Sequence, residues 1–121
     1  CQPSLPLGDP DALHSPPDEL ATVRARLERE DLTVRAYRFD SDRFCTAGRF
    51  AAYAAALGDR FVPTVLPSTA ANPAPPPFSA QVVGGPHSVV TAHLIDAAGE
   101  PTLAARDEIL AFFAHRLTPH A

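Results

Sequence analysis

An acidic turn and a histidine are the residues of this sequence best placed to do chemistry. Asp40 and Asp42 directly follow the apolar segment 32–39, and His87 lies in the loop after a second apolar segment, 61–66. A carboxylate that binds an imidazole holds the ring in one tautomer and stabilises the cation formed when the ring removes a proton from a nucleophile. An acid followed by a histidine therefore points to hydrolysis through a nucleophile, with Asp42 and Asp40 as competing acids.

The segments around these residues alternate between helix and strand. Residues 32–39 and 61–66 are rich in branched and aromatic side chains, which favours strands, and Pro63 would suit a strand near a sheet edge. Capping residues and apolar spacing indicate three helices. They run from a cap at Ser15 to about Arg29, from a cap at Thr46 to a stop at Gly58, and from Pro101 to Leu117. The leucine and aromatic stripe of the last helix is expected to pack in a core.

This order of segments predicts an α/β fold with a mostly parallel sheet and helices on both faces, because parallel strands are covered by their crossover helices. In such sheets, sites gather in the loops beyond the carboxyl ends of the strands. Asp42 and His87 should therefore meet at one edge of the sheet. Asp40 is closer to the end of its strand and is expected to shape the turn.

Length and composition fit one soluble domain over residues 1–121. The net charge is -4, with ten arginines and no lysine, so the chain lacks the basic surface of a protein that binds nucleic acid or an anionic membrane. No apolar run approaches the ~20 residues of a membrane helix. Cys1 and Cys45 are too few for a disulfide framework, which indicates reduced thiols and a cytoplasmic location.

Two segments are expected to serve as connections. Residues 67–86 are rich in proline, and consecutive prolines remove backbone donors and stiffen the chain. Residues 1–17 combine the end of a strand with a loop that could act as a lid over the site.

Several stretches resemble the dienelactone hydrolase family of the α/β-hydrolase superfamily. They are RFDSDRFCTAGRF at 38–50, GPHSVVT at 85–91 and RDEILAFF at 106–113, and CQPSLP at 1–6 looks like the end of a central strand. The resemblance covers nearly the whole chain. It implies Asp42 as the triad acid, His87 as the triad base, an ester or lactone as substrate, and neither a metal nor an organic cofactor.

The nucleophile of that family has no counterpart in these residues. The family carries it in a G-x-S-x-G or G-x-C-x-G elbow, whereas no serine here has glycines two positions on either side, and Cys45 follows Arg43 at that spacing. An HGGG-type oxyanion loop is also absent. Since the family places the nucleophile before the acid, we expect the missing half to precede Cys1, and the absent initiator methionine agrees with this.

The chain is therefore expected to be the C-terminal half of a carboxylic ester hydrolase, inactive by itself. A partial parallel sheet would expose an unpaired edge, so association with the missing N-terminal half or self-association is expected. The alternative is a non-catalytic, truncated or degenerate hydrolase that acts as a binding module.

The remaining polar residues have simpler interpretations. His87, His93 and Asp96 could ligate a metal, but their spacing matches no zinc pattern, and His93 and Asp96 are expected in solvated loops. Arg43 and Arg49 could bind a substrate carboxylate, although solvated arginines near a helix start are the simpler expectation. Three further histidines are expected at the surface: His14, His115 and His120.

Overall fold

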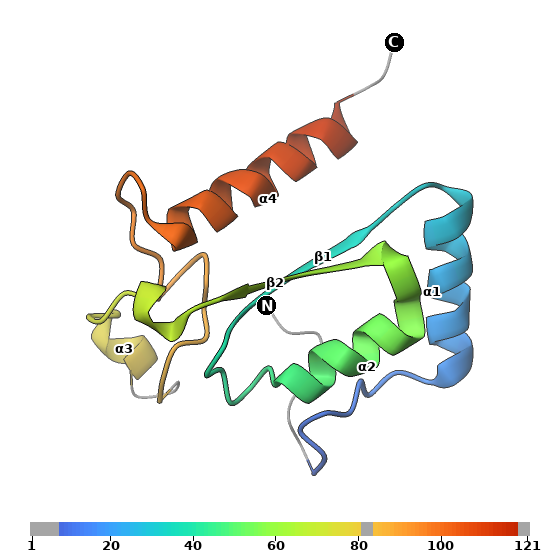
Figure 1. Cartoon of the computed structure of the whole chain (residues 1–121), viewed down its shortest axis with the longest axis horizontal. Coiled ribbons are helices and arrows are strands. Elements are labelled where there is room, and N and C mark those ends of the chain that lie inside the picture. The colour runs from blue at the N-terminus through green and yellow to red at the C-terminus, as the bar shows by residue number, and fades with distance from the viewer. Residues whose placement is uncertain (1–7, 81–83, 119–121) are drawn as a thin grey trace.

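The computed structural model describes residues 8–80 and 84–118. Its elements are α1 (Pro17–Arg29), β1 (Val34–Phe39), α2 (Ala47–Leu57), β2 (Phe61–Leu66), α3 (Pro77–Ala80) and α4 (Pro101–Leu117) (Figure 1). Two short 3-10 helices, η1 (Gly58–Arg60) and η2 (Ser68–Ala70), flank β2. The predicted alternation of helix and strand is confirmed. The elements not predicted are η1, η2 and the short α3, and the last two interrupt the proline-rich connection.

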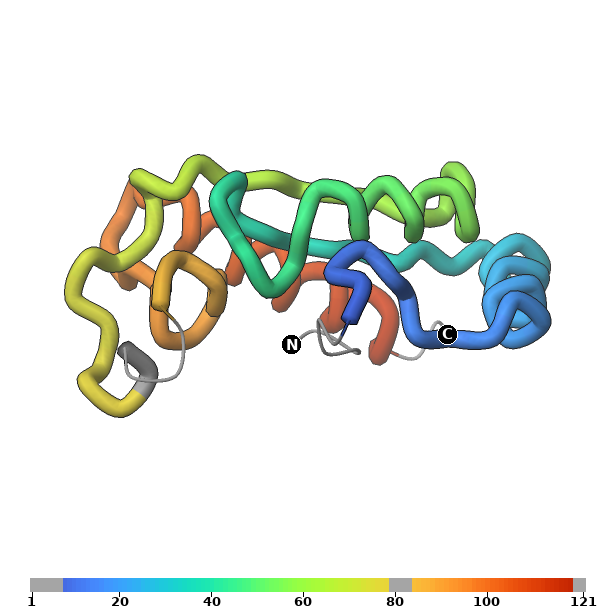
Figure 2. Tube along the Cα trace, turned by 90° about the horizontal axis from the view of Figure 1, so that it is seen from below, coloured from blue at the N-terminus to red at the C-terminus, as the bar shows by residue number. Residues whose placement is uncertain are grey.

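The two strands of the described sheet pair in parallel, with Val34 opposite Phe61 and Phe39 opposite Leu66. Their carboxyl ends consequently lie at the same end of the sheet. Figures 1 and 2 show the loops that follow β2 and precede α4 gathered at this end, with α1 at the other. The predicted parallel α/β arrangement is confirmed at this level, and two strands are compatible with part of a larger sheet.

The two faces of the strand pair pack against different parts of the chain. Alternate side chains of a strand point to opposite faces, and the side chains of β1 divide between two clusters. One cluster joins the sheet to α4 and the loop before it: Phe39, Leu66, Ala71, Val89 and Ala105. The other joins the sheet to α1 and α2 through Leu27, Leu57 and Phe61, with Val34 and Ala36 packed against them.

The structure has the predicted caps of α2 but not the predicted cap of α1. The Thr46 side chain accepts a hydrogen bond from the Arg49 amide at 3.1 Å, and Gly58 follows α2 with φ +60, as expected. The predicted cap at Ser15 is wrong, because α1 begins at Pro17 and Pro16 takes the cap position without a side-chain bond. Ser15 lies one residue too early for its hydroxyl to reach the first turn's amides.

The expected core packing of α4 is wrong for its C-terminal turns. Thr102 and Ala105 are buried, whereas Leu110, Phe113 and Leu117 are 56%, 51% and 77% exposed. In Figure 1, α4 lies beside the strand pair and not over it. Its later turns reach β1 through the pair of Arg35 with Glu108, which leaves the outward side of the helix exposed. No described helix is both long enough and apolar enough to cross a membrane.

Candidate active site

Asp42 and His87 meet beyond the carboxyl ends of the two strands, as the sequence predicts. The Nδ1 atom of His87 lies 2.7 Å from Oδ2 of Asp42. The Asp42 side chain is 1% exposed, and that of His87 is 24% exposed. The edge-to-face contact of His87 with the Phe44 ring, at 5.4 Å between centroids, supports the imidazole from the side.

The second oxygen of Asp42 is held by the backbone that follows it. Its Oδ1 accepts hydrogen bonds from the amides of Phe44 at 2.8 Å and Cys45 at 3.0 Å. Burial raises the pKa of the Asp42 carboxyl, but the bonds from His87, Cys45 and Phe44 outweigh burial, and the pKa lies below its ordinary value. An ionised Asp42 accepts the proton on Nδ1 of His87, which leaves Nε2 as the basic atom of the ring.

A buried arginine shapes the loop that carries Asp42. Arg38, at the end of β1, is 5% exposed. Its Nε donates to the Cys45 carbonyl at 2.8 Å and its Nη2 to the Asp40 carbonyl at 3.0 Å. The planar guanidinium thus binds both ends of the turn, which fixes the acid loop before α2 begins at its Thr46 cap.

Asp40 joins the two strand ends and takes no part in the pair with His87. Its carboxylate accepts hydrogen bonds from the amide of Ser68 at 2.9 Å and from the Ser68 hydroxyl. These bonds lower the pKa of Asp40. Of the two carboxylates, Asp42 is therefore the one that contacts His87, and Asp40 shapes the turn as expected.

The pair faces a groove of about 740 Å³ along β1. Asp42 and His87 lie at this groove, whose walls come from β1, α2 and α4. Its aromatic lining is Tyr37, Phe50, Tyr53, Phe61, Phe112 and Phe113. A volume of this size lies in the range of about 300–1,000 Å³ found for small-molecule sites.

No nucleophile is in place beside His87 within the described residues, where no hydroxyl or thiol is hydrogen bonded to its ring. Cys45 lines the same groove with a free thiol. Burial and the neighbouring Asp42 charge raise the pKa of this thiol, which favours its unreactive protonated form.

Two side chains that the sequence predicts to be solvated are buried. Arg49 is fully buried, so the expectation of a solvated arginine is wrong there, while Arg43 is exposed and donates to the Gly84 carbonyl at 3.0 Å. His93 is 4% exposed and not solvated. The Phe39 ring contacts His93 from far away in the sequence, and no local pattern reports such a neighbour.

The other candidate residues have surface positions. Asp96 is exposed, as expected, and pairs with Arg106 at 3.0 Å. His14 and His115 are exposed, also as expected, and His120 lies outside the described residues. In the described ranges, no group of three His, Cys, Asp or Glu side chains is arranged to hold a metal ion.

The segment before α1 reaches the start of α2. Asp11 accepts a hydrogen bond from the Thr46 hydroxyl, and its carboxylate lies against Gly48 so closely that an added Cβ would stand 2.3 Å from it. This part of the expected lid is thus anchored beside the acid loop. The expected strand end at 1–7 lies outside the described residues.

Comparison of the chain with protein-family models, with curated proteins and with solved structures finds no match.

Proposed function

We propose that this chain supplies the acid and the base of an ester hydrolase, as the C-terminal portion of a dienelactone hydrolase-like α/β hydrolase. The observation that carries the proposal is the buried Asp42 carboxylate at 2.7 Å from Nδ1 of His87, with its other oxygen held by two amides. This arrangement leaves Nε2 of His87 as the atom that accepts a proton. The resemblance of the surrounding residues to that family supports the same roles.

In the proposed reaction, the proton of a serine or cysteine nucleophile moves to Nε2 of His87 as the nucleophile attacks the carbonyl carbon of an ester or lactone. The imidazolium then gives this proton to the leaving alkoxide as the carbon–oxygen bond breaks. His87 next takes a proton from a water molecule as the water oxygen attacks the acyl carbon. The bond between this carbon and the nucleophile then breaks, and the imidazolium returns its proton to the nucleophile as the acid product leaves. Asp42 stays ionised throughout and stabilises the imidazolium, and no metal or organic cofactor takes part.

The groove along β1 indicates where the nucleophile would come from. In the described sheet, β1 pairs with β2 on one edge only. A further parallel strand on its other edge would end at the same edge of the sheet as Asp42 and His87. We propose that the missing N-terminal half provides this strand, the nucleophile that follows it and the oxyanion donors. The free thiol of Cys45 fits the cytoplasmic location included in this proposal.

The test uses the protein extended in frame through the coding sequence upstream of Cys1. This protein should hydrolyse short aryl esters, and His87→Ala should reduce kcat/KM by about 100-fold or more, the usual contribution of a general base. His14→Asn, at an exposed histidine, is the control and should leave the rate unchanged. A His87→Ala variant within about tenfold of the parent enzyme would overturn the assignment.

The alternative is a non-catalytic module derived from a hydrolase. A start codon and ribosome-binding site directly at this position, with no upstream elbow, would favour this alternative. So would an extended protein that binds aryl esters without hydrolysing them.

A further inference from the structure

Both the backbone and the ring of His93 form hydrogen bonds with the loop that carries His87. Its amide donates to the Ser88 carbonyl at 3.0 Å, and its carbonyl accepts from the Asn72 amide at 2.9 Å. His93 therefore links the segment after β2 to the turn that begins at Ser88.

The ring of His93 folds back onto the same turn. Its Nδ1 accepts from the Ser88 amide at 3.0 Å and, more weakly, from the His87 amide at 3.4 Å. Backbone amides can only donate, so Nδ1 must be unprotonated. A neutral imidazole has one donor and one acceptor nitrogen, and His93 must then carry its proton on Nε2.

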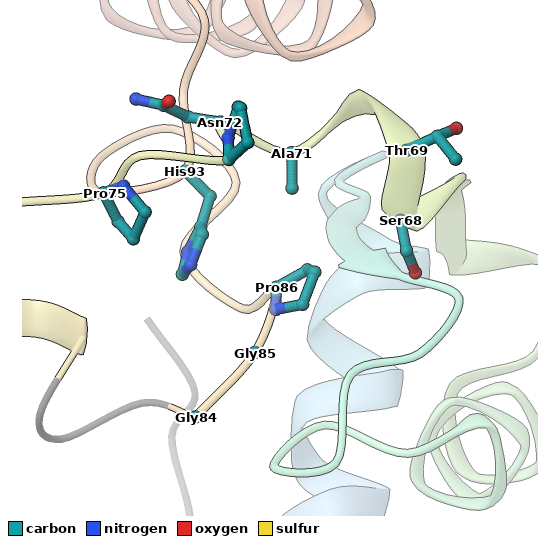
Figure 3. A pocket seen from close by; sticks show the side chains of 10 residues that line it. Ser68, Thr69, Ala71, Asn72, Pro75, Gly84, Gly85, Pro86 and His93 are labelled. Atoms are coloured by element: carbon teal, nitrogen blue, oxygen red, sulfur yellow. The ribbon is translucent and has the colours of Figure 1, made fainter.

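The surroundings of this ring favour the neutral form and limit its rotation. The Phe39 ring contacts His93 edge-on at 6.2 Å. Figure 3 shows the ring between Pro75 and Pro86, at a hollow of about 480 Å³. Burial lowers the pKa of His93, the neighbouring His87 lowers it further, and these effects outweigh the opposing charge of Asp42.

We propose that His93 is a positioning residue for His87. The Nδ1 atom of His93 holds the amides of residues 87 and 88 and so aims the His87 ring at Asp42. The two histidines have opposite tautomers, with the proton on Nδ1 in His87 and on Nε2 in His93. The inference rests on the proposed function only in treating His87 as a base.

The tautomers can be read in the full chain labelled with ¹⁵N-histidine, by long-range ¹H–¹⁵N correlation near neutral pH. The expected spectrum shows a protonated Nδ1 for His87 and a protonated Nε2 for His93. A protonated Nδ1 on His93 would overturn the proposal without any variant, because that atom could not accept from the two amides.

A matched pair of variants tests the positioning role itself. In His93→Asn, the side-chain oxygen stands near the place of Nδ1 and can still accept, whereas His93→Leu has a similar shape without an acceptor. Leucine should speed hydrogen exchange at the Ser88 amide by about tenfold, the factor typical of one lost hydrogen bond, and weaken the Nδ1–H signal of His87. Asparagine should preserve both readouts.

Two results would contradict the positioning role: unchanged readouts in His93→Leu, or equal losses in both variants. His14→Asn, at an exposed histidine, is the control for the substitution of a histidine. If His93→Leu does not fold, a His93→Asn variant that loses the His87 signal still overturns the proposal.

The extended protein separates this inference from the proposed function. If it does not hydrolyse esters while the spectra are as expected, the positioning role stands and the hydrolase proposal fails. If it is active, His93→Leu should lower kcat more than it raises KM, with rescue by His93→Asn. An active enzyme unaffected by His93→Leu overturns the inference alone.

Discussion

The charge of Asp42 is the property on which the site depends at the scale of single residues. Three hydrogen bonds converge on a carboxylate that is almost entirely buried, and two of them come from amides of its own loop. The loop would leave these amides unpaired without the acid. Asp42 therefore links the chemistry of His87 to the stability of the turn.

Asp42→Asn should separate these two roles. The amide can still accept from the backbone, but its nitrogen would face Nδ1 of His87 and force the proton onto Nε2. We expect a loss of about 1–3 kcal/mol in the free energy of unfolding by urea and a fall of about 10⁴-fold in kcat of the extended protein. Asp59→Asn, at an exposed aspartate, is the control, and equal effects at the two positions would contradict the prediction.

The buried His93 should make folding stability depend on pH in the mildly acidic range. Its pKa is below the ordinary 6.5, so the unfolded chain binds a proton before the folded chain does. The stabilisation is fully present above that ordinary value and is lost as pH falls towards the folded value. The titrating groups that face His93 are His87 and Asp42.

The measurement is the difference in unfolding free energy between the parent chain and His93→Asn, followed from about pH 8 to about pH 5. Both proteins keep His87 and Asp42, so the comparison isolates the effect of His93 in its own surroundings. The advantage of the parent chain should shrink as pH falls. A constant difference across this range would contradict a depressed pKa for His93.

Arg38 is the residue whose shape matters most to the acid loop. Its guanidinium binds two carbonyls from a buried position over the Phe50 ring. Arg38→Lys keeps the charge but cannot present two donors in one plane. We expect it to cost about 1–2 kcal/mol of unfolding free energy, while Arg24→Lys, in an exposed pair with Glu28, should cost well under 1 kcal/mol. Equal losses would show that charge alone is required.

At the scale of elements, the start of α2 depends on a contact with the segment before α1. The Asp11 carboxylate occupies the space in which a side chain at position 48 would lie. Gly48→Ala should therefore destabilise the chain by displacing Asp11 from Thr46. In an Asp11→Ala background the same change should stabilise it by about 0.5–1 kcal/mol, because alanine favours the helix. Urea unfolding of the four proteins measures this reversal, and the same sign in both backgrounds would exclude the contact.

The sequence predicted the helices and strands whose signals lie within the element itself, such as caps and apolar spacing. The strand 61–66 and the helix 101–117 have the expected bounds, whereas β1 starts at Val34, two residues after the expected Leu32. The meeting of Asp42 with His87 followed from one further step, the geometry of parallel strands. The burial of His93 could not be predicted, because it depends on Phe39 and Asn72, which lie far away in the sequence.

At the scale of the whole molecule, residues 8–80 and 84–118 leave apolar surface uncovered where the described sheet ends. Beyond the edge of β1, α4 presents Leu110, Phe113 and Leu117 to solvent. An unpaired strand edge beside an exposed apolar stripe favours association with other chains. The same surfaces would be covered if further strands continued the sheet beside β1, as the proposed function requires.

The chain by itself should therefore self-associate or unfold at low denaturant concentration. Sedimentation velocity should show concentration-dependent association, and Phe113→Glu combined with Leu117→Glu should reduce it by placing charges on the stripe. Ala104→Glu combined with Ala111→Glu adds the same charge at other exposed positions of α4 and should leave association unchanged. A monomer at all concentrations with a sharp cooperative melt would show instead that two strands and their helices form a stable unit, which would remove the folding argument for a further half.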